Sequence, residues 1–429
     1  MSVLKMGLRS LLYRRKQYVA LFWVCVVGVG ISLFCLFLVE GMLDSLEGKA
    51  RLYYGGDFTF IGGQNDLTFD NVDDFIKEIV PIFPPDTVVS SRFDYDADYS
   101  SFYFEGTEAR QRVIKGIDFS KEVELFQEFN YLAGNPSKMA GSNGILLSEP
   151  IAKNLGVQVG DSITFLLRTV QGYTNTVILE VQGIFRDSSL FGMYTSYMDI
   201  DCLRESYGMP SHWANRICIS FPGNYTATKA DVQEFQARLE QKFTMFPLVD
   251  DKEIFYEPLT TGQFSEPHYA LVGLYANLED LKIVIDAMNI IAFFIICLLV
   301  IIIMVGVSST YRVIVMKRIN EIGIYKSIGM RRLGIFSLLL SETSILICVG
   351  CLVGMLFSLA LCQFISFFNF SFIPAFDVFL VDGRLLPSFS LLQSLGISVL
   401  VYVTTTFAVL FSVQKSVRMT PVEALGVTE

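Results

Sequence analysis

Hydrophobic residues along this chain are gathered into four long runs rather than spread evenly. Charged residues are absent from 19–39, from 287–311, from 343–376 and from 385–414. A bilayer core about 30 Å thick is crossed by roughly 20 helical residues. Each run is therefore long enough to be a transmembrane helix, and the pattern predicts a membrane protein with four spans.

Between the first two runs, the pattern changes to short apolar segments separated by turn residues. Apolar positions in 42–53 lie three and four apart, which predicts that the first span continues as a helical stalk ending at Gly55. Residues 148–167 predict a helix, a turn and a strand, and 176–185 alternates like the second strand of a hairpin. We therefore expect segment 40–286 to be a large α+β domain.

These patterns divide the chain into nine segments. They are a basic N-terminus at 1–18, a first span at 19–39, the α+β domain with its helical stalks at 40–286, a second span at 287–311, a loop at 312–335, a third span at 336–366, a loop at 367–384, a fourth span at 385–413 and a C-terminus at 414–429. No A-x-A-like site follows the first apolar run, so we expect a retained anchor rather than a cleaved signal.

The distribution of charge predicts the orientation of these spans. Basic residues precede the first run and follow the second and fourth, which by the positive-inside bias places both termini in the cytoplasm. The segment 40–286 would then lie outside, and its 37 acidic and 19 basic residues give a net charge of −18, against +8 for the rest. This acidity argues against a nucleic-acid partner.

The chain lacks the sequence motifs of common enzymes. It contains neither a phosphate-binding G-x-x-x-x-G-K-[ST] loop nor a G-x-S-x-G motif, and its two histidines, His212 and His268, are far apart in sequence, which disfavours a metal site. We expect neither catalytic residues nor a bound cofactor. Cys202 and Cys218 are the cysteines outside the apolar segments, and sequence alone leaves open whether they form a disulfide.

The stretch RINEIGIYKSIGMRR, residues 318–332, lies between the second and third runs and differs from both. Apolar residues recur at every third position, while the charged side chains face elsewhere. This spacing predicts a short amphipathic helix at the cytoplasmic surface of the membrane. Such a helix either binds a partner or is an elbow that only rests on lipid headgroups.

Several motifs resemble one family of membrane proteins. The stretch EIGIYKSIGMRR, followed by Glu342, Gly350 and Gly354, resembles the signature of FtsX-like permease domains, and TPVEALG at 420–426 is similar to that family's closing motif. The segments IKGID, LGVQVGDSITF and EVQGIF resemble the periplasmic core domain of MacB-type and lipoprotein-releasing permeases. These motifs occur in the family's order over nearly the whole chain.

The resemblance implies a permease subunit of a type VII ABC transporter. In that family two permease chains, identical or different, dimerise, and each binds a separate ATPase subunit that holds ATP and Mg²⁺. ATP-driven motion is transmitted to the periplasmic domain, and the stretch matching 318–332 is the coupling helix. The implied ATPase-contacting residues are Arg318, Glu321, Gly323, Lys326, Gly329, Arg331 and Arg332.

The size and arrangement of the segments most resemble the LolC/LolE permeases of the inner membrane, which release lipoproteins and pair with a LolD ATPase. An FtsX-like scaffold that regulates an external cell-wall hydrolase is the alternative, and an anchored binding protein without an ATPase is a third. The carrier-binding hook is replaced by the short RTVQGYTN, which puts capture of a carrier in doubt. A lipid-facing substrate cavity would use Phe34, Phe37, Met42, Phe293 and Phe294.

Glu342 is the one acidic residue in the expected third span. Because it lies within one to three turns of Arg331 and Arg332, we expect its carboxylate at the interface or facing the loop. A pathway for a polar or ionic substrate would require buried charged pairs within the spans. We expect none, which suits a machine whose substrate does not cross the membrane interior.

Overall fold

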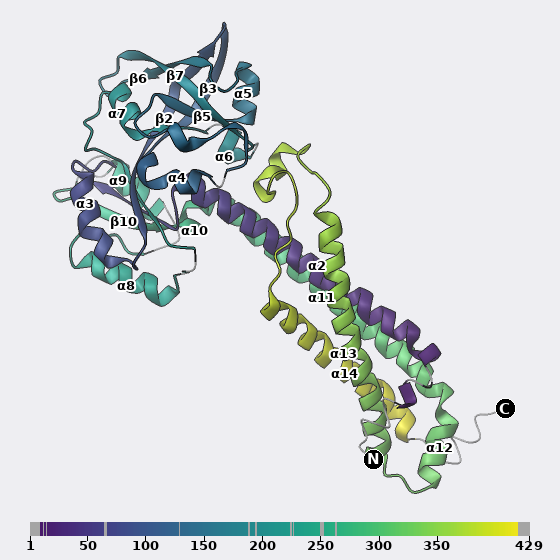
Figure 1. Cartoon of the computed structure of the whole chain (residues 1–429). Helices are drawn as coiled ribbons and strands as arrows, with labels where there is room; N and C mark the ends of the chain where they lie inside the picture. Colours follow the sequence, from purple (N-terminus) through teal and green to yellow (C-terminus); the bar gives the residue numbers. More distant parts are fainter. Residues whose placement is uncertain are drawn as a thin grey trace. The chain divides into compact units, whose positions relative to one another are not determined.

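The computed structural model describes residues 9–11, 13, 15–63, 67–127, 129–187, 189–193, 195–223, 225, 227–248, 253–261 and 264–418. They form two compact units (Figure 1). The helical unit contains the residues up to Leu43, Ile285–Asn369 and those from Arg384 onward. The α+β unit contains Asp44–Val284 and Phe370–Gly383.

Long apolar helices supply the helical unit. They are α2 (Arg15–Tyr54), α11 (Glu279–Lys317), α13 (Arg332–Ile365) and α14 (Leu391–Arg418), and within the described residues these are the helices long and apolar enough to cross a membrane. The fourth begins at Leu391 rather than at residue 385 as expected. Pro387 disfavours helical geometry in the residue before it, and the Ser390 hydroxyl accepts from the Gln393 amide at 3.5 Å at the start of the helix. A short helix, α12 (Ile319–Ser327), joins α11 to α13.

Glycines let the backbones of α2 and α13 approach closely. A Cβ atom on Gly30 would lie 2.5 Å from the Phe357 ring, and one on Gly354 would lie 3.0 Å from the Val26 carbonyl oxygen. Small residues at such crossings are a common means of packing helices in membranes. One hydrophobic core, with members from α2, α11, α13 and α14, results.

The helix α2 contributes residues to both units and ends where the sequence predicts. Gly55 and Gly56 follow it with φ angles of 96° and 128°, which residues other than glycine rarely adopt. Both amides donate to the Arg51 carbonyl oxygen at 2.8 Å and so satisfy the end of the helix. The expected span and its expected stalk are therefore one continuous helix.

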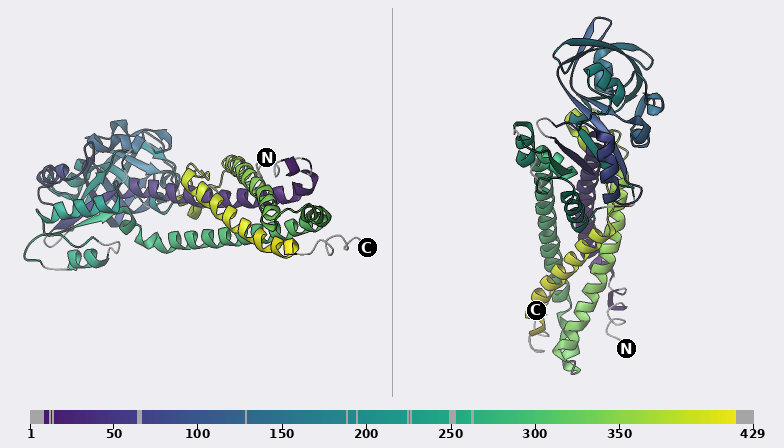
Figure 2. Two further views of the ribbon diagram at one scale, coloured as in Figure 1. Left: turned by 90° about the horizontal axis from the view of Figure 1, so that it is seen from below. Right: turned by 90° about the vertical axis from the view of Figure 1, so that its left-hand side faces the viewer.

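The α+β unit contains a closed barrel of strands, which the sequence did not reveal. Going round the barrel, the strands are β2 (Val88–Phe104), β3 (Thr107–Ile117), β8 (Thr195–Asp199), β5 (Gly144–Ser148), β7 (Thr174–Phe185) and β6 (Ser162–Arg168). Pairing of β6 with β2, with Phe165 opposite Phe102, closes the ring. The ring is visible in the right-hand view of Figure 2.

Aromatic side chains and two helices fill the barrel core. The Phe102 and Phe165 rings are fully buried with centroids 5.3 Å apart. The helices α5 (Glu149–Leu155) and α7 (Ile200–Tyr207) add apolar side chains to the same core. The predicted β6–β7 hairpin is confirmed, and the short segment 169–173 connects its strands.

A second sheet shares the first part of β2 with the barrel. Its order is β10 (His268–Gly273), β1 (Phe58–Gly63), β9 (Arg216–Ser220) and β2, while β4 (Tyr131–Gly134) pairs with β7. The remaining short elements are α3 (Val72–Ile79), η1 (Val80–Ile82), α4 (Phe119–Gln127), η2 (Pro136–Lys138), α6 (Leu190–Met193), α8 (Lys229–Glu240), α9 (Glu253–Thr261), α10 (Leu274–Asn277) and η3 (Pro374–Phe379).

The close approach of α2 and α13 gives a first prediction. Gly354→Val should destabilise the protein by about 1–3 kcal/mol, because its methyl groups would clash with α2. Gly396→Val is the matched control, since open space surrounds Gly396 on α14. Thermal unfolding in detergent should show a lower Tm for the first variant and almost no change for the second. Equal Tm values would show that the glycine is not needed at the crossing.

Candidate functional site

The short helix α12 is held between two long helices and is partly exposed. Ile319 and Ile322 are buried, as the periodicity predicts, and Ile322 belongs to the helical core. After Ser327 the chain turns at Gly329, whose φ of 91° lets the Met330 amide donate to the Tyr325 carbonyl oxygen at 3.0 Å. This left-handed glycine is a common helix end, so α12 stops just before Ile328.

A buried network of charged and polar side chains lies at the start of α12. Arg318 Nη1 donates to Glu342 Oε2 on α13 at 2.5 Å, and Arg318 Nη2 donates to Glu342 Oε1 at 3.2 Å. The hydroxyl of Tyr18 on α2 donates to Glu342 Oε2 at 2.7 Å and accepts from Arg318 Nη1 at 3.0 Å. These three residues, which we call the Arg318 network, join α12 to α13 and α2.

Because the residues of the Arg318 network are buried, separating them from one another is costly. Glu342 is 0% exposed, Tyr18 is 1% exposed and Arg318 is 2% exposed. A charge left without its partner in such surroundings costs several kcal/mol, because neither water nor another ion replaces the lost interaction. Displacement of Arg318 would therefore carry Glu342 and Tyr18 with it or else break a costly pair.

The outer face of α12 and the turn after it expose apolar side chains. Ile324 is 51% exposed, Ile328 is 79% exposed, and Leu333 at the start of α13 is 80% exposed. Arg331 is exposed beside them in the chain. Exposed apolar side chains that are close together in the chain, next to a positive charge, suit the docking of a partner protein.

The predicted coupling residues divide into two groups. Arg318 and Gly323 are buried, so they do not present a surface to a partner, whereas Gly329 and Arg331 are exposed. Glu321 lies partly exposed and accepts from Arg318 Nε at 3.3 Å. Lys326 is partly exposed, and the side chain of Arg332 lies outside the described residues.

Glu342 does not face the loop as one form of the expectation had it. Its carboxylate is enclosed in the helical core, because Arg318, from the start of α12, turns inward to pair with it. Arg318 lies in the expected loop 312–335, so this ion pair joins the loop to the third span and is not a charged pair within the spans. Tyr18 was not singled out from the sequence, although a lone carboxylate in an apolar segment is itself a signal that polar partners are buried nearby.

The residues proposed to line a substrate cavity lie in different environments. Phe37 is 1% exposed and packs against Phe389, with ring centroids 5.2 Å apart. Phe293 and Phe294 are 64% and 66% exposed on α11 and contact each other. Phe34 and Met42 are half-buried. Phe37 therefore has a packing role in this structure, whereas the α11 pair is accessible.

In the α+β unit, a second buried ion pair holds the other end of α2. Arg92 is fully buried, and its Nε donates to both carboxylate oxygens of Glu122 at 3.1 and 3.0 Å. Its Nη1 donates to the Leu52 carbonyl oxygen at 2.9 Å and the Tyr53 carbonyl oxygen at 3.3 Å. A cation at these last carbonyls also suits the helix dipole. No sequence pattern predicted this contact.

Further charges surround the end of α2. Lys115 donates to Asp94 Oδ2 at 2.7 Å, and its Nζ lies 4.1 Å from the centre of the Tyr53 ring. Burial lowers the pKa of Lys115 to about 8, partly opposed by Asp94. Burial alone would raise the pKa of Asp94, but Lys115 and Arg216 bring it below its ordinary value. Of these contacts, the one between Lys115 and the Tyr53 ring reaches the last turn of α2.

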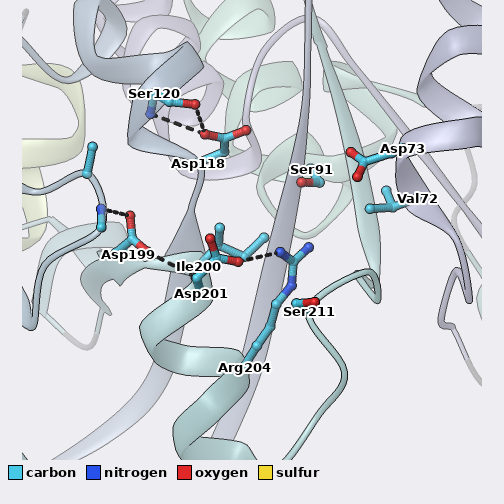
Figure 3. A pocket seen from close by; sticks show the side chains of 12 residues that line it. Val72, Asp73, Ser91, Asp118, Ser120, Asp199, Ile200, Asp201, Arg204 and Ser211 are labelled. Carbon is cyan, nitrogen blue, oxygen red and sulfur yellow. Dashed lines mark hydrogen bonds and ion pairs between the residues drawn. The ribbon is translucent and has the colours of Figure 1, made fainter.

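A polar pocket of about 350 Å³ lies elsewhere in the α+β unit (Figure 3). Three of the carboxylates that line it are engaged locally: Asp118 accepts from the Ser120 amide, Asp199 from the Gly141 amide, and Asp201 from Arg204. Among the described residues, no group of three or more potential ligands could hold a metal ion. We therefore assign no chemistry to this pocket.

The structure also bears on the two cysteines of the α+β unit. Cys202 lies on α7 and Cys218 on β9, and both are free thiols. Burial raises the pKa of Cys202 to about 11 and that of Cys218 to about 12. They are therefore protonated and unreactive near neutral pH.

Residues 287–421 match the FtsX-like permease C-terminal family. This FtsX-like domain covers α12 and the long helices that flank it. The match supports an ABC transporter permease of the FtsX, MacB and Lol type, and permeases of this type work with an ABC ATPase. No curated protein matches the chain.

The Arg318 network gives a second prediction. Glu342→Gln should destabilise the protein by about 3–5 kcal/mol, because it leaves the Arg318 charge buried without a counter-charge. Replacing both Arg318 and Glu342 by methionine should be less damaging than Glu342→Gln, since no unpaired charge remains. Tm in detergent is the measurement.

Glu321→Gln is the control for this prediction. The Glu321 side chain is 31% exposed, and loss of its contact with Arg318 should cost less than about 1 kcal/mol. If Glu342→Gln were no more harmful than Glu321→Gln, the network would contribute little to the stability of the helical unit.

Proposed function

We propose that this chain is the permease subunit of a type VII ABC transporter, which transmits ATP-driven motion of a separate ATPase to the α+β unit. The observation that carries the proposal is the Arg318 network. It ties the start of α12 to α2, and the other end of α2 is held by Arg92 in the α+β unit. Motion imposed on α12 would therefore reach α2 through the hydrogen bonds of the buried Tyr18 hydroxyl with Arg318 and Glu342.

The arrangement of charge supports a particular orientation for this machine. With both termini in the cytoplasm, α12 lies where an ATPase can reach it, and the acidic α+β unit lies outside the cytoplasmic membrane. ATP and Mg²⁺ would be bound by the ATPase subunit, because this sequence has no phosphate-binding loop of its own. A second permease chain, identical or different, would complete the complex.

The proposed ATPase site is the exposed face of α12. Ile324, Ile328 and Leu333 would be buried by the ATPase, with Arg331 at the rim. Ile328 is the most informative of these because it is exposed and does not belong to the Arg318 network. Buried apolar residues near the centre of an interface commonly supply most of its binding free energy.

Release of lipoproteins from the membrane is the substrate role that we favour. Phe293 and Phe294 are accessible on α11 and could contact an acyl chain entering from the bilayer. The short β6–β7 turn favours a LolE-like member that does not itself capture a carrier protein. Regulation of an external cell-wall hydrolase would use the same transmission of motion but would require no acyl-chain site.

The docking surface gives the third prediction. Ile328→Glu should reduce recovery of an ABC ATPase with the tagged full-length chain by at least about tenfold, since a buried charge at an interface centre costs more than about 1.4 kcal/mol. The measurement is purification in mild detergent, followed by identification of the co-purifying chains by mass spectrometry. Acylated proteins recovered in the same preparation would support the lipoprotein role.

The matched control is Ile178→Glu. Ile178 is 68% exposed on β7 in the α+β unit, so its replacement should leave ATPase recovery unchanged. Absence of an ATPase from the wild-type preparation would contradict the proposal and favour an anchored binding protein. Equal recovery of the ATPase with both variants would show that the docking surface does not lie on α12.

A further inference from the structure

The segment between α13 and α14 is folded rather than a simple linker. The Phe370 amide donates to the Gly383 carbonyl oxygen at 2.7 Å, which closes residues 370–383 into a loop. Within it Leu380 is fully buried and Val378 is 6% exposed, and η3 contacts α6. The loop therefore belongs to the α+β unit, although both flanking helices belong to the helical unit.

A mostly buried ion cluster fastens this loop to α2. Lys49, in the part of α2 that belongs to the α+β unit, donates to the Asp377 carbonyl oxygen at 2.6 Å and to Asp377 Oδ2 at 3.2 Å. Asp187, near α6 in the chain, lies 3.6 Å from the same ammonium group. The exposed fractions of the side chains are 18% for Lys49, 3% for Asp377 and 9% for Asp187.

The ion cluster depends on Lys49, because two carboxylates share this one lysine. With Lys49 in place, a single ammonium group lies against both carboxylates. Without it, Asp377 and Asp187 would remain buried with like charges and without the cation that they share, which is costly. A further hydrogen bond, from Asn130 Nδ2 to Asp382 Oδ1 at 2.6 Å, attaches the loop at the surface.

The residues after the loop are also attached to α2, within the helical unit. The Ser388 amide donates to the Phe37 carbonyl oxygen at 3.0 Å, and the Phe389 ring packs on Phe37. Gly41 permits this approach, because a Cβ atom there would lie 2.0 Å from the Leu386 carbonyl oxygen. The segment that leads into α14 thus follows α2 by close backbone contact.

We propose that Lys49 and Asp377 are positioning residues of a second mechanical connection, through which α13 and α14 displace the α+β unit together with α2. The inference rests on the proposed transmission of ATP-driven motion and assigns it a second route. The loop is short, and its ion cluster cannot open without separating buried charges. Motion of α13 and α14 is therefore transmitted to the α+β unit. A flexible linker would not transmit it.

The test uses the full-length chain purified with its ATPase, with and without a non-hydrolysable ATP analogue. In Lys49→Met, amides of residues 370–383 should exchange with deuterium about tenfold faster than in the wild type, since opening the loop no longer separates an ion pair. The nucleotide-dependent change in exchange at α6 and β7 should fall to less than about one third of its wild-type size. ATPase recovery should be unchanged.

Two variants keep the experiment specific. Lys49→Arg retains the positive charge and should preserve the nucleotide response. Lys153→Met also removes a lysine that pairs with a carboxylate, that of Glu149, but the Lys153 side chain is 75% exposed. This variant should behave like the wild type.

The outcomes separate this inference from the proposed function. If Lys49→Met exchanges faster in the loop but keeps the full nucleotide response, the connection through Lys49 is overturned while the transporter proposal stands. If Lys49→Arg loses the response as completely as Lys49→Met, the charge is not what matters and the inference is equally overturned. If the wild type binds no ATPase or shows no nucleotide response, the proposed function itself fails.

Discussion

Burial of a positive and a negative charge together in an apolar helix bundle is the constraint on which the proposed coupling depends. Arg318 pairs with Glu342 where neither is accessible to water, and Tyr18 forms hydrogen bonds with both. Replacement of such a pair by apolar residues is often neutral or stabilising, whereas removal of one partner is harmful. The network is therefore better explained by the geometry it imposes on α12, α13 and α2 than by added stability.

The same helix, α2, is held by ionic contacts at its other end. Arg92 donates to its last carbonyl groups and pairs with the buried Glu122. Lys49 attaches the loop after α13 to α2 a little earlier along the helix. Near both ends, α2 is therefore hydrogen-bonded to buried charged groups, and such contacts break only at high cost in buried surroundings.

Local patterns in the sequence predicted much of this architecture. Runs without charge indicated the four long helices, the three- and four-residue spacing indicated the extension of α2, and alternation indicated the β6–β7 hairpin. The closed barrel depends instead on pairs distant in sequence, such as β2 with β6, which no local pattern reveals. Ile328 was expected on the apolar face of α12, but the helix ends before it and leaves it exposed.

The candidate site was predicted only in part for a related reason. A basic residue next to a span indicates topology, so nothing in the pattern distinguished Arg318 from Arg331, yet one is buried and the other exposed. The difference arises from Glu342, which lies on the next long helix and is distant in sequence. Arg92 and Glu122 lie in a polar domain where charged residues are common, and their pairing depends on the tertiary fold.

The central claim is that nucleotide-driven displacement of α12 reaches α2 through Tyr18. Its most direct test is amide exchange of the chain purified with its ATPase, with and without a non-hydrolysable ATP analogue, in Tyr18→Phe and in a Tyr13→Phe control whose residue is 88% exposed. Tyr18→Phe leaves the Arg318–Glu342 pair in place and removes only its link to α2. The account predicts that this variant binds the ATPase but loses most of the nucleotide-dependent change at residues 52–57 and in β2, while Tyr13→Phe keeps it. An unchanged response in Tyr18→Phe would contradict the account.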